Sequence, residues 1–274
     1  PCTAREAMSS SADIGEPAAR RLRVTVEYDG TNFQGFQRQP KGRTVQAVLE
    51  AALAQYTPAP TVLAAGRTDA GVHASGQVVH FTYAGRVPVA KLAAIVNGQL
   101  PDDLAIRDCR EVGPTFNARY SALSRTYRYQ FIRAPEREPL RERYAWRLTG
   151  MLDLAAMQEA ILLLPGTHTF RHFGRIPGSP EQARRSQQQH GWRRTVLAAE
   201  LTEAADTLCF QIEANAYLTH MVRAIVGALV AVGRGRLQAA QLQEALLDET
   251  SDVALAPIAP PHGLCLFQVR YPDD

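Results

Sequence analysis

Short runs of alternating hydrophobic and polar residues mark the first half of the chain, and stretches with helical spacing separate them. Residues 21–28 alternate, which predicts a strand, and apolar residues at helical spacing from Val45 to Leu53 predict a helix capped by Thr44. Two strands, a helix and a final strand complete this half, predicted over 61–65, 77–83, 88–97 and 104–110 in turn. The resulting order, strand-helix-strand-strand-helix-strand, is that of a ferredoxin-like α+β unit.

The second half repeats that order without visible sequence identity to the first. Its predicted elements are a strand, a helix, a hairpin, a strongly apolar helix, a further helix and a last strand, over 126–133, 152–164, 194–214, 220–232, 237–247 and 264–271. A connection rich in Arg, Glu and Pro over 134–143 breaks the pattern and predicts a domain boundary. We therefore expect an N-terminal α+β domain over 21–133 and a C-terminal α+β domain over 144–274, with a ligand cleft between their sheets.

Length and composition indicate a chain that can bury a full core. It has 274 residues, of which 46% are hydrophobic, and no uninterrupted apolar stretch of the length that a membrane helix needs. Residues 1–20 are rich in Ala, Ser and Arg and lack the apolar core of a secretory signal, so we expect a disordered leader there. The four cysteines form no Cys-x-x-Cys pair, which argues against a zinc site or a disulfide framework and favours a reducing cytoplasm; they are Cys2, Cys109, Cys209 and Cys265.

The charge balance is small in total but unusual in kind. The formal net charge is +3, and all but two of the 30 Lys and Arg residues are arginines, the exceptions being Lys41 and Lys91. Arginine binds phosphate through two hydrogen bonds and stacks on bases, so the bias is compatible with a nucleic-acid partner. A GC-rich genome would produce the same count, and both explanations stay open.

One short segment, GRTDAGVH over residues 66–73, carries the strongest chemical signal. A single carboxylate, Asp69, lies between glycines in a short loop, with Arg67 two residues before it. A structural interpretation makes Asp69 an Asx-turn residue that accepts nearby backbone N–H groups. A chemical interpretation makes it a nucleophile or general base, kept ionised by charge pairing with Arg67. A phosphate-binding loop is excluded, because a carboxylate would repel the ligand and the Walker pattern is absent.

Other basic residues are candidates for contacts with a phosphate backbone. Arg125, Arg128 and Arg133 lie on the strand predicted over 126–133 or next to it, and Arg119 precedes it. Solvated charges on the outer face of a strand are the alternative explanation.

Five segments, in order along the chain, resemble the tRNA pseudouridine synthase A family. They are VEYDGTNFQGFQRQ (26–39), GRTDAGVHASGQVVHF (66–81), FNARYSALSRTYRYQF (116–131), NAYLTHMVRAIVGALVAVG (215–233) and GLCLFQVRYP (263–272). The resemblance extends from about residue 22 to residue 272. It implies an α+β fold with two ferredoxin-like, RRM-like halves joined into one extended antiparallel sheet, with helices on one side and a central active-site cleft.

The same resemblance implies roles for five residues. Asp69 matches the family's catalytic aspartate, and Tyr127 matches the tyrosine that stacks on the target uracil. Arg67 matches the arginine that pairs with the aspartate and helps to hold the flipped nucleotide. Leu264 matches an apolar residue packed near the base, and Arg223 becomes a candidate contact with tRNA or the active site.

The implied activity is isomerisation of uridine to pseudouridine at positions 38, 39 and 40 of the anticodon arm of tRNA, by a homodimer without cofactor or metal. That reaction breaks the N-glycosidic bond, turns the uracil and rejoins it through C5, so it needs a nucleophile and an enclosed site that retains the detached base. The sequence leaves open whether Asp69 attacks C1′ of the ribose, attacks C6 of the base or assists elimination. Tyr127 supplies an aromatic face for the extruded base, and its hydroxyl is a candidate relay for the C5 proton.

Two alternatives stay open at the level of sequence. One is a non-catalytic RNA-binding protein or tRNA chaperone on the same scaffold, and the other is a pseudouridine synthase for a different RNA. The segment 174–191 departs from the family, which has a shorter connection there. We expect a mobile loop that bears on the range of tRNAs accepted.

Overall fold

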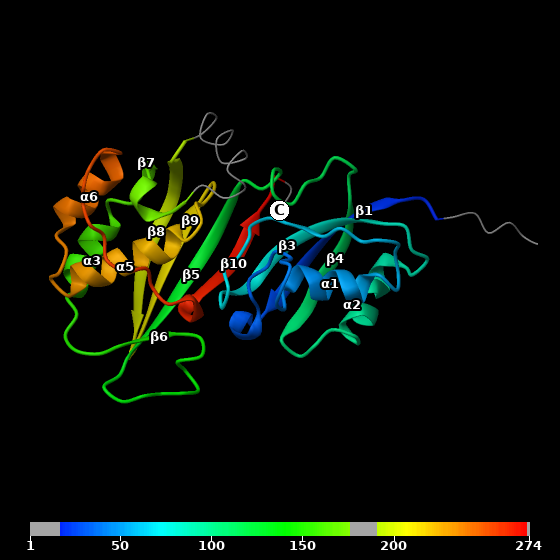
Figure 1. Ribbon diagram of the computed structural model, residues 1–274, viewed down its shortest axis with the longest axis horizontal. Helices are drawn as coiled ribbons and strands as arrows, with labels where there is room; N and C mark the ends of the chain where they lie inside the picture. The colour runs from blue at the N-terminus through cyan, green and yellow to red at the C-terminus, as the bar shows by residue number, and fades with distance from the viewer. Residues whose placement is uncertain (1–16, 176–190, 273–274) are drawn as a thin grey trace, which may run out of the picture.

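The computed structural model describes residues 17–175 and 191–272, and within them the strands form one large sheet (Figure 1). The strands are β1 (Arg20–Tyr28), β2 (Leu63–Ala64), β3 (His73–Tyr83), β4 (Leu104–Val112), β5 (Ser124–Arg133), β6 (Trp146–Leu148), β7 (Gly166–Thr169), β8 (Arg193–Ala204), β9 (Thr207–Ala214) and β10 (Leu264–Arg270). The helices are α1 (Val45–Leu53), α2 (Val89–Asn97), α3 (Leu154–Ile161), α5 (Met221–Gly233) and α6 (Ala239–Leu247). Across the sheet the order is β4-β1-β3-β10-β5-β9-β8-β7, while β2 pairs with β3 and β6 pairs with β5.

Each half of the sheet has the same internal strand order. In the first half the order is β4-β1-β3-β2, and in the second it is β10-β5-β9-β8. If the four strands of each half are numbered along the chain, both halves have the strand order 4-1-3-2, as in a ferredoxin-like unit. The prediction of an α+β protein with two ferredoxin-like halves in one sheet is therefore confirmed.

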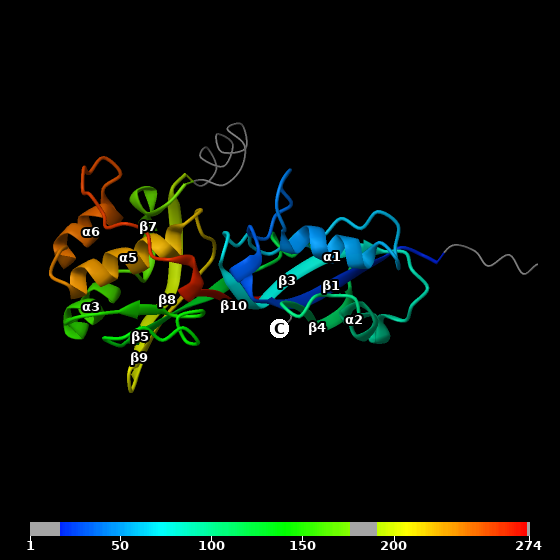
Figure 2. The same cartoon turned by 60° about the horizontal axis from the view of Figure 1, so that its bottom comes forward.

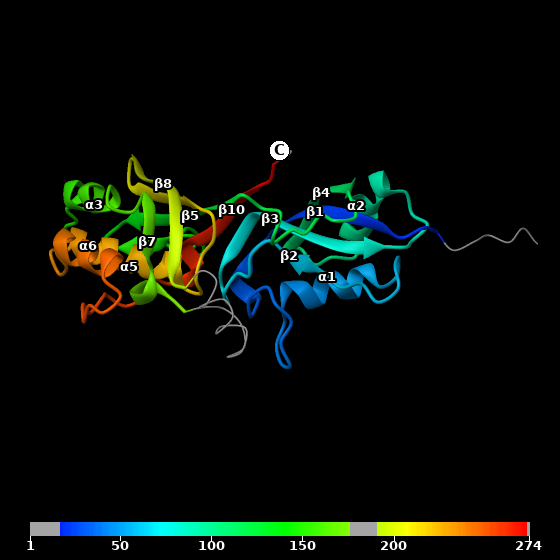
Figure 3. The same ribbon diagram turned by 90° about the horizontal axis from the view of Figure 1, so that it is seen from above.

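The helices form two groups at opposite ends of the molecule, with α1 and α2 at the first half and α3, α5 and α6 at the second (Figures 2 and 3). Every residue of α5 except Arg223 is buried, and α3 packs against it. Helix α1 begins as the sequence predicts, with the Thr44 hydroxyl accepting the backbone N–H of Ala47. The apolar faces of α1 and α5 both contribute to one continuous core.

One row of buried side chains crosses both halves of the sheet. The register pairs Tyr28 with Ala74, and Ala74 with Leu266 of β10. It continues by pairing Leu266 with Tyr127, and Tyr127 with Ile212. Paired residues project from the same face, and none of these five is more than 8% exposed. The core therefore runs through the junction and fixes how one half lies against the other.

The strands that meet at the junction are parallel. β10 and β3 pair through Cys265 with His73 and Leu266 with Ala74, and β5 and β6 are parallel as well. The sheet is antiparallel, as expected, except at these two places. Within its own half, β10 is antiparallel to β5, and β3 is antiparallel to β1.

The division into domains over 21–133 and 144–274 stays a prediction, because the sheet is continuous across both halves. β5, which that division counts with the first domain, pairs with β9 and β10 of the second half. Residues 1–16 of the leader expected over 1–20 lie outside the described residues. Residues 176–190 of the segment 174–191 lie outside them as well. Over the described part of the chain, no helix has the length and apolar character needed to cross a membrane.

A buried histidine ties β3 to the segment that precedes β5. His80 is 1% exposed, and its Nδ1 accepts the backbone N–H of Ala118 at 3.0 Å. The other ring nitrogen hydrogen-bonds the backbone of Leu63. Burial, helped by the positive charge of Arg21, lowers the pKa of His80 from 6.5 to about 4. The imidazole is therefore neutral in the folded protein at neutral pH.

Acidification should destabilise the fold through His80. Because the pKa of His80 is lower in the folded than in the unfolded protein, the unfolded chain binds an extra proton between pH 6.5 and about pH 4. The free energy of unfolding should fall as the pH decreases across this window, by about 3 kcal/mol from this residue. Urea unfolding of the wild type and of His80→Gln, whose amide can make both hydrogen bonds but does not titrate, measures the contribution. Identical pH dependence of the two proteins would contradict it.

Candidate active site

A cleft of about 1160 Å³ opens where the two halves meet. Its walls come from the loop between β2 and β3, the segment that leads into β5, and the chain that leads into α5. Among the described residues that line it, Asp69 is the only carboxylate, whereas six are arginines: Arg67, Arg119, Arg125, Arg193, Arg194 and Arg223. The cleft is therefore suited to an anionic ligand, with a single negative group available for chemistry.

The loop that carries Asp69 is held against the segment 29–42. The backbone N–H of Phe36 donates to the carbonyl oxygen of Thr68 at 3.1 Å. Gly35 has a φ of +86°, and a Cβ there would lie 2.8 Å from the same Thr68 oxygen, so glycine allows the two segments to approach. The aromatic, glycine-rich segment that precedes α1 thus serves as a support for the Asp69 loop.

A buried polar network supports the same loop from beneath. The hydroxyl oxygens of Tyr28 and Thr68 are 2.8 Å apart, and the amide nitrogen of Gln77 donates to the carbonyl oxygen of Gly66 at 2.7 Å. Tyr28 and Gln77 are almost completely buried, and burial raises the pKa of Tyr28 well above its usual range, so its hydroxyl keeps its proton. Sequence reasoning missed this network. The available signal was Gln77, a polar residue at the start of a predicted strand rich in apolar residues.

Asp69 is paired with two residues of the second half. Its Oδ2 accepts a hydrogen bond from Nη1 of Arg223 at 3.2 Å and lies 3.6 Å from Nε2 of His220. The side chains of Asp69 and Arg223 are 23% and 11% exposed, so this is a partly buried ion pair. His220 is the N-cap of α5, and the dipole of that helix also favours a negative charge at this end.

Arg67 does not make the ion pair with Asp69 that the sequence suggested. Among the described residues, the basic groups within 4 Å of Asp69 are Arg223 and His220. Arg67 lines the cleft, and its pKa is lowered by burial and by the neighbouring Arg119. The Asp69 side chain faces the second half instead, where α5 brings a guanidinium group to it. The contact of Arg67 with a nucleotide stays a prediction.

Tyr127 and Leu264 lie in the interior of the cleft. Tyr127 is 8% exposed, and its ring meets that of Tyr217 edge-on with the centroids 5.0 Å apart. Burial raises the pKa of Tyr127 well above its usual range, and the nearby Asp69 charge acts in the same direction. Leu264 is 5% exposed and pairs across the sheet with Tyr129. All five residues singled out from the sequence therefore line one cleft.

Arg125 braces the wall of the cleft and is not free to bind phosphate. It is 8% exposed, and its guanidinium group donates to the backbone carbonyl oxygens of Ala65, Arg119, Ala122 and Asn215. Burial lowers its pKa. These acceptors belong to three separate segments, so Arg125 joins the strand before the Asp69 loop to both neighbouring walls.

Arg128 and Arg133, unlike Arg125, are not among the described residues that line the cleft. Arg128 stacks on the ring of Phe267 with its Cζ 3.3 Å from the centroid, and its Nε donates to Gln211. Arg133 forms an ion pair with Glu203. Successive side chains of a strand alternate between faces, so Arg128 projects from the face opposite to Tyr127. Of the basic residues considered for a phosphate path, Arg119 alone presents its side chain to the cleft without such a bracing role.

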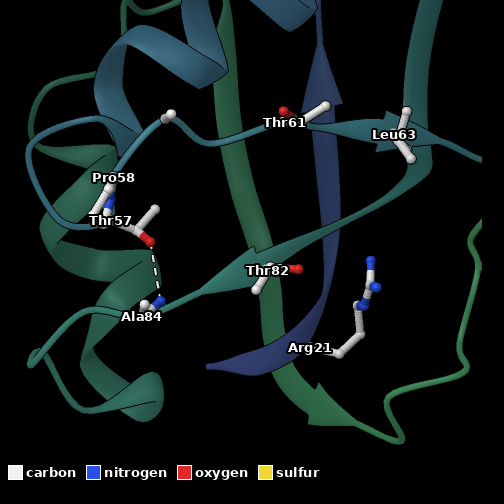
Figure 4. Close-up of a pocket in the computed structure, with 8 residues that line it drawn as sticks. Arg21, Thr57, Pro58, Thr61, Leu63, Thr82 and Ala84 are labelled. Carbon is white, nitrogen blue, oxygen red and sulfur yellow. Dashed lines mark hydrogen bonds between the residues drawn. The ribbon is translucent and has the colours of Figure 1, made fainter. Parts of the chain in front are cut away.

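A second, smaller cavity of about 290 Å³ lies beside β1, β3 and the segment before β2 (Figure 4). Arg21 is the only charged side chain among its described lining residues, and the Thr57 hydroxyl is occupied by the backbone N–H of Ala84. This cavity therefore lacks paired groups for acid-base or nucleophilic chemistry. In the ranges 17–175 and 191–272, no group of three or more His, Cys, Asp or Glu side chains is placed to hold a metal ion.

Known proteins resemble this chain over most of its length. A family model described as tRNA pseudouridine synthase matches residues 24–121 and 160–272, which include Asp69 and Arg223. The tRNA pseudouridine synthase A of Exiguobacterium sp. strain AT1b is 40% identical over 254 residues, which cover 92% of this chain and 98% of the relative. The protein of the same name from Geobacter sulfurreducens is 38% identical over 253 residues, covering 92% of this chain and 100% of the relative.

One solved structure shows a weaker similarity. The crystal structure of a Cbf5-Nop10-Gar1 complex contains a chain that is 14% identical with a TM-score of 0.31, over 76% of this chain and 45% of that chain. The chain thus spans less than half of that structure's chain. A TM-score of this size supports no conclusion about a shared fold or function.

Replacing Arg125 by Leu should destabilise the protein by about 3 kcal/mol, because several buried carbonyl oxygens then lose their donor. Arg128→Gln, on the opposite face of the same strand, is the matched control and should cost less than about 1 kcal/mol. Urea unfolding at neutral pH measures both changes. A cost for Arg125→Leu no greater than that of the control would contradict the bracing role.

Proposed function

This chain belongs to the tRNA pseudouridine synthase family, and we propose that it isomerises uridines at positions 38, 39 and 40 of the anticodon stem-loop with Asp69 as the nucleophile. Membership of the family makes the chain an isomerase that forms pseudouridine in tRNA. The observation that carries the assignment of the nucleophile is that Asp69 is the only carboxylate among the described residues of the cleft. The positions in tRNA rest on the resemblance of five ordered segments of the sequence to this family.

The reaction exchanges one bond between ribose and base for another. The bond from N1 of uracil to C1′ breaks, the base turns, a bond from C5 to C1′ forms, and C5 loses a proton while N1 gains one. Asp69 attacks C1′, attacks C6 or assists elimination, and each route requires its carboxylate beside the target nucleotide. Arg223 directs that carboxylate by a hydrogen bond of 3.2 Å. It also neutralises the negative charge, so that an RNA backbone can approach.

Tyr127 holds the uracil while it is detached from the ribose. Its ring is almost buried and is itself supported by Tyr217, so it offers a fixed aromatic face. Because burial raises the pKa of Tyr127, the hydroxyl keeps its proton at neutral pH. The neutral hydroxyl therefore acts as a proton relay and not as a phenolate base. It accepts the proton from C5 while it donates its own proton to another acceptor. Leu264 supplies apolar contact beside it.

The partner in this proposal is the anticodon arm of tRNA, bound by two copies of the chain in the cytoplasm without cofactor or metal. The arginines of the cleft support it, because guanidinium groups bind phosphate oxygens and the target base must leave the helical stack to reach Asp69. The homodimer rests on the family resemblance, and the cytoplasmic location rests on the scattered cysteines of the sequence.

Stem-loop substrates with one C5-tritiated uridine test the proposal. Wild-type protein should release tritium when the uridine stands at position 38, 39 or 40 and not at other positions of the loop. Asp69→Asn should abolish release at all three, because the amide is no nucleophile, while affinity for the RNA stays within about threefold since phosphate contacts dominate binding.

Asp108→Asn is the matched control, because Asp108 is an exposed carboxylate on β4 outside the cleft. It should turn over at the wild-type rate. Substantial release by Asp69→Asn would refute the assignment of the nucleophile, and release from other positions would refute the proposed substrate. Tight RNA binding by the wild type without any release would favour a non-catalytic RNA-binding protein.

A further inference from the structure

Tyr120 is a highly exposed aromatic side chain that lines the cleft. It is 79% exposed, whereas Tyr127 in the same cleft is 8% exposed. This difference in burial places Tyr127 in the interior and Tyr120 at the mouth. The proposed reaction uses Tyr127 and leaves Tyr120 without a role.

The turn that carries Tyr120 is held by its own hydrogen bonds. The Asn117 side chain accepts the backbone N–H groups of Arg119 and Tyr120, and the backbone N–H of Asn117 donates to the Ser121 hydroxyl. The backbone N–H of Ser121 in turn donates to the carbonyl oxygen of Asn117. The conformation of this short segment is therefore set before any ligand arrives.

Buried side chains anchor the same turn to the sheet. His80 accepts the backbone N–H of Ala118, and the Tyr271 hydroxyl donates to the Ala118 carbonyl oxygen at 2.7 Å. Arg125 donates to the carbonyl oxygen of Arg119. Because this backbone is already held, a ligand that contacts the Tyr120 ring does not have to order the backbone of the turn.

Positive charges flank the exposed ring. The Cζ of Arg119 lies 5.5 Å from the ring centroid of Tyr120. Arg119 and Tyr120 are both close enough to Arg67 to influence its pKa. An exposed aromatic face beside guanidinium groups is how proteins bind unpaired RNA, because the cations contact phosphates while the ring stacks on a base.

We propose that Tyr120 stacks on a nucleotide next to the target uridine and so stabilises the flipped state, an inference that rests on the proposed function. When the target base leaves the stack for the interior of the cleft, its neighbour loses a stacking partner. That neighbour stays at the mouth, where Tyr120 is exposed. The ring replaces the missing stacking partner and contributes to the free energy of RNA binding. This contribution does not depend on which base is present, since every base has a π face.

Photocrosslinking tests the contact. Stem-loops are prepared with 5-iodouridine on the 5′ or the 3′ side of the target position, bound to wild-type protein and irradiated at long wavelength. Peptide mass spectrometry should find the crosslink on Tyr120 for at least one of the two substrates. Crosslinking requires binding only, so it examines Tyr120 even if the wild type releases no tritium and the proposed chemistry fails.

Kinetics separate stacking from a structural role. Tyr120→Leu should raise KM about tenfold with little change in kcat, and Tyr120→Phe, which keeps the ring, should stay within about twofold of the wild type. Leu140→Ala is the control, because Leu140 is 92% exposed and does not line the cleft. Circular dichroism and urea unfolding should show all three variants folded, since the Tyr120 side chain is outside the core.

Three results would overturn the proposal. One is an RNA complex in which neither 5-iodouridine substrate crosslinks to Tyr120. Another is Tyr120→Leu with wild-type KM. The third is Tyr120→Phe impaired as much as Tyr120→Leu, which would assign the effect to the hydroxyl group and not to the ring.

Discussion

The ion pair between Asp69 and Arg223 joins the two halves of the molecule at the candidate active site. Asp69 belongs to a loop that the first half supports through Thr68, and Arg223 belongs to α5, which the second half buries. Neither half can supply both groups. The row of buried side chains that crosses the junction keeps them within hydrogen-bond distance, so the continuous sheet positions the two groups of the candidate active site as well as stabilising the fold.

The abundance of arginine has several distinct structural uses in this cleft. Arg223 pairs with the carboxylate, Arg125 braces three segments through backbone carbonyl oxygens, and Arg119 lies beside an exposed aromatic ring. A guanidinium group suits each use, because it offers several donors in one plane and stays charged when partly buried. Among the described residues that line the cleft, one carboxylate lies with six arginines, and that division of charge is consistent with the proposed reaction.

Local sequence patterns predicted most of the elements, but not the short strands β6 and β7 or the contacts between distant segments. Alternation predicted β1, and Thr44 predicted the start of α1, because both depend on neighbouring residues alone. The predicted ion-pair partner of Asp69 was wrong. Arg67 is near Asp69 in sequence, whereas the observed partner, Arg223, is 154 residues away and lies beside Asp69 only because the two halves meet at the junction. His80 and Gln77 were visible as polar residues on an inward-facing strand. Their partners, Ala118 and Gly66, depend on tertiary structure that no periodicity encodes.

A double-mutant cycle on the free energy of unfolding tests most directly whether the pair of Asp69 and Arg223 joins the halves. Asp69→Asn and Arg223→Gln should each destabilise the protein, because each leaves a partly buried charge without its partner. The double variant leaves neither charge, so the two effects should be less than additive by at least about 1 kcal/mol. Effects that add within experimental error would contradict the account, because they would mean that the two side chains do not interact across the junction.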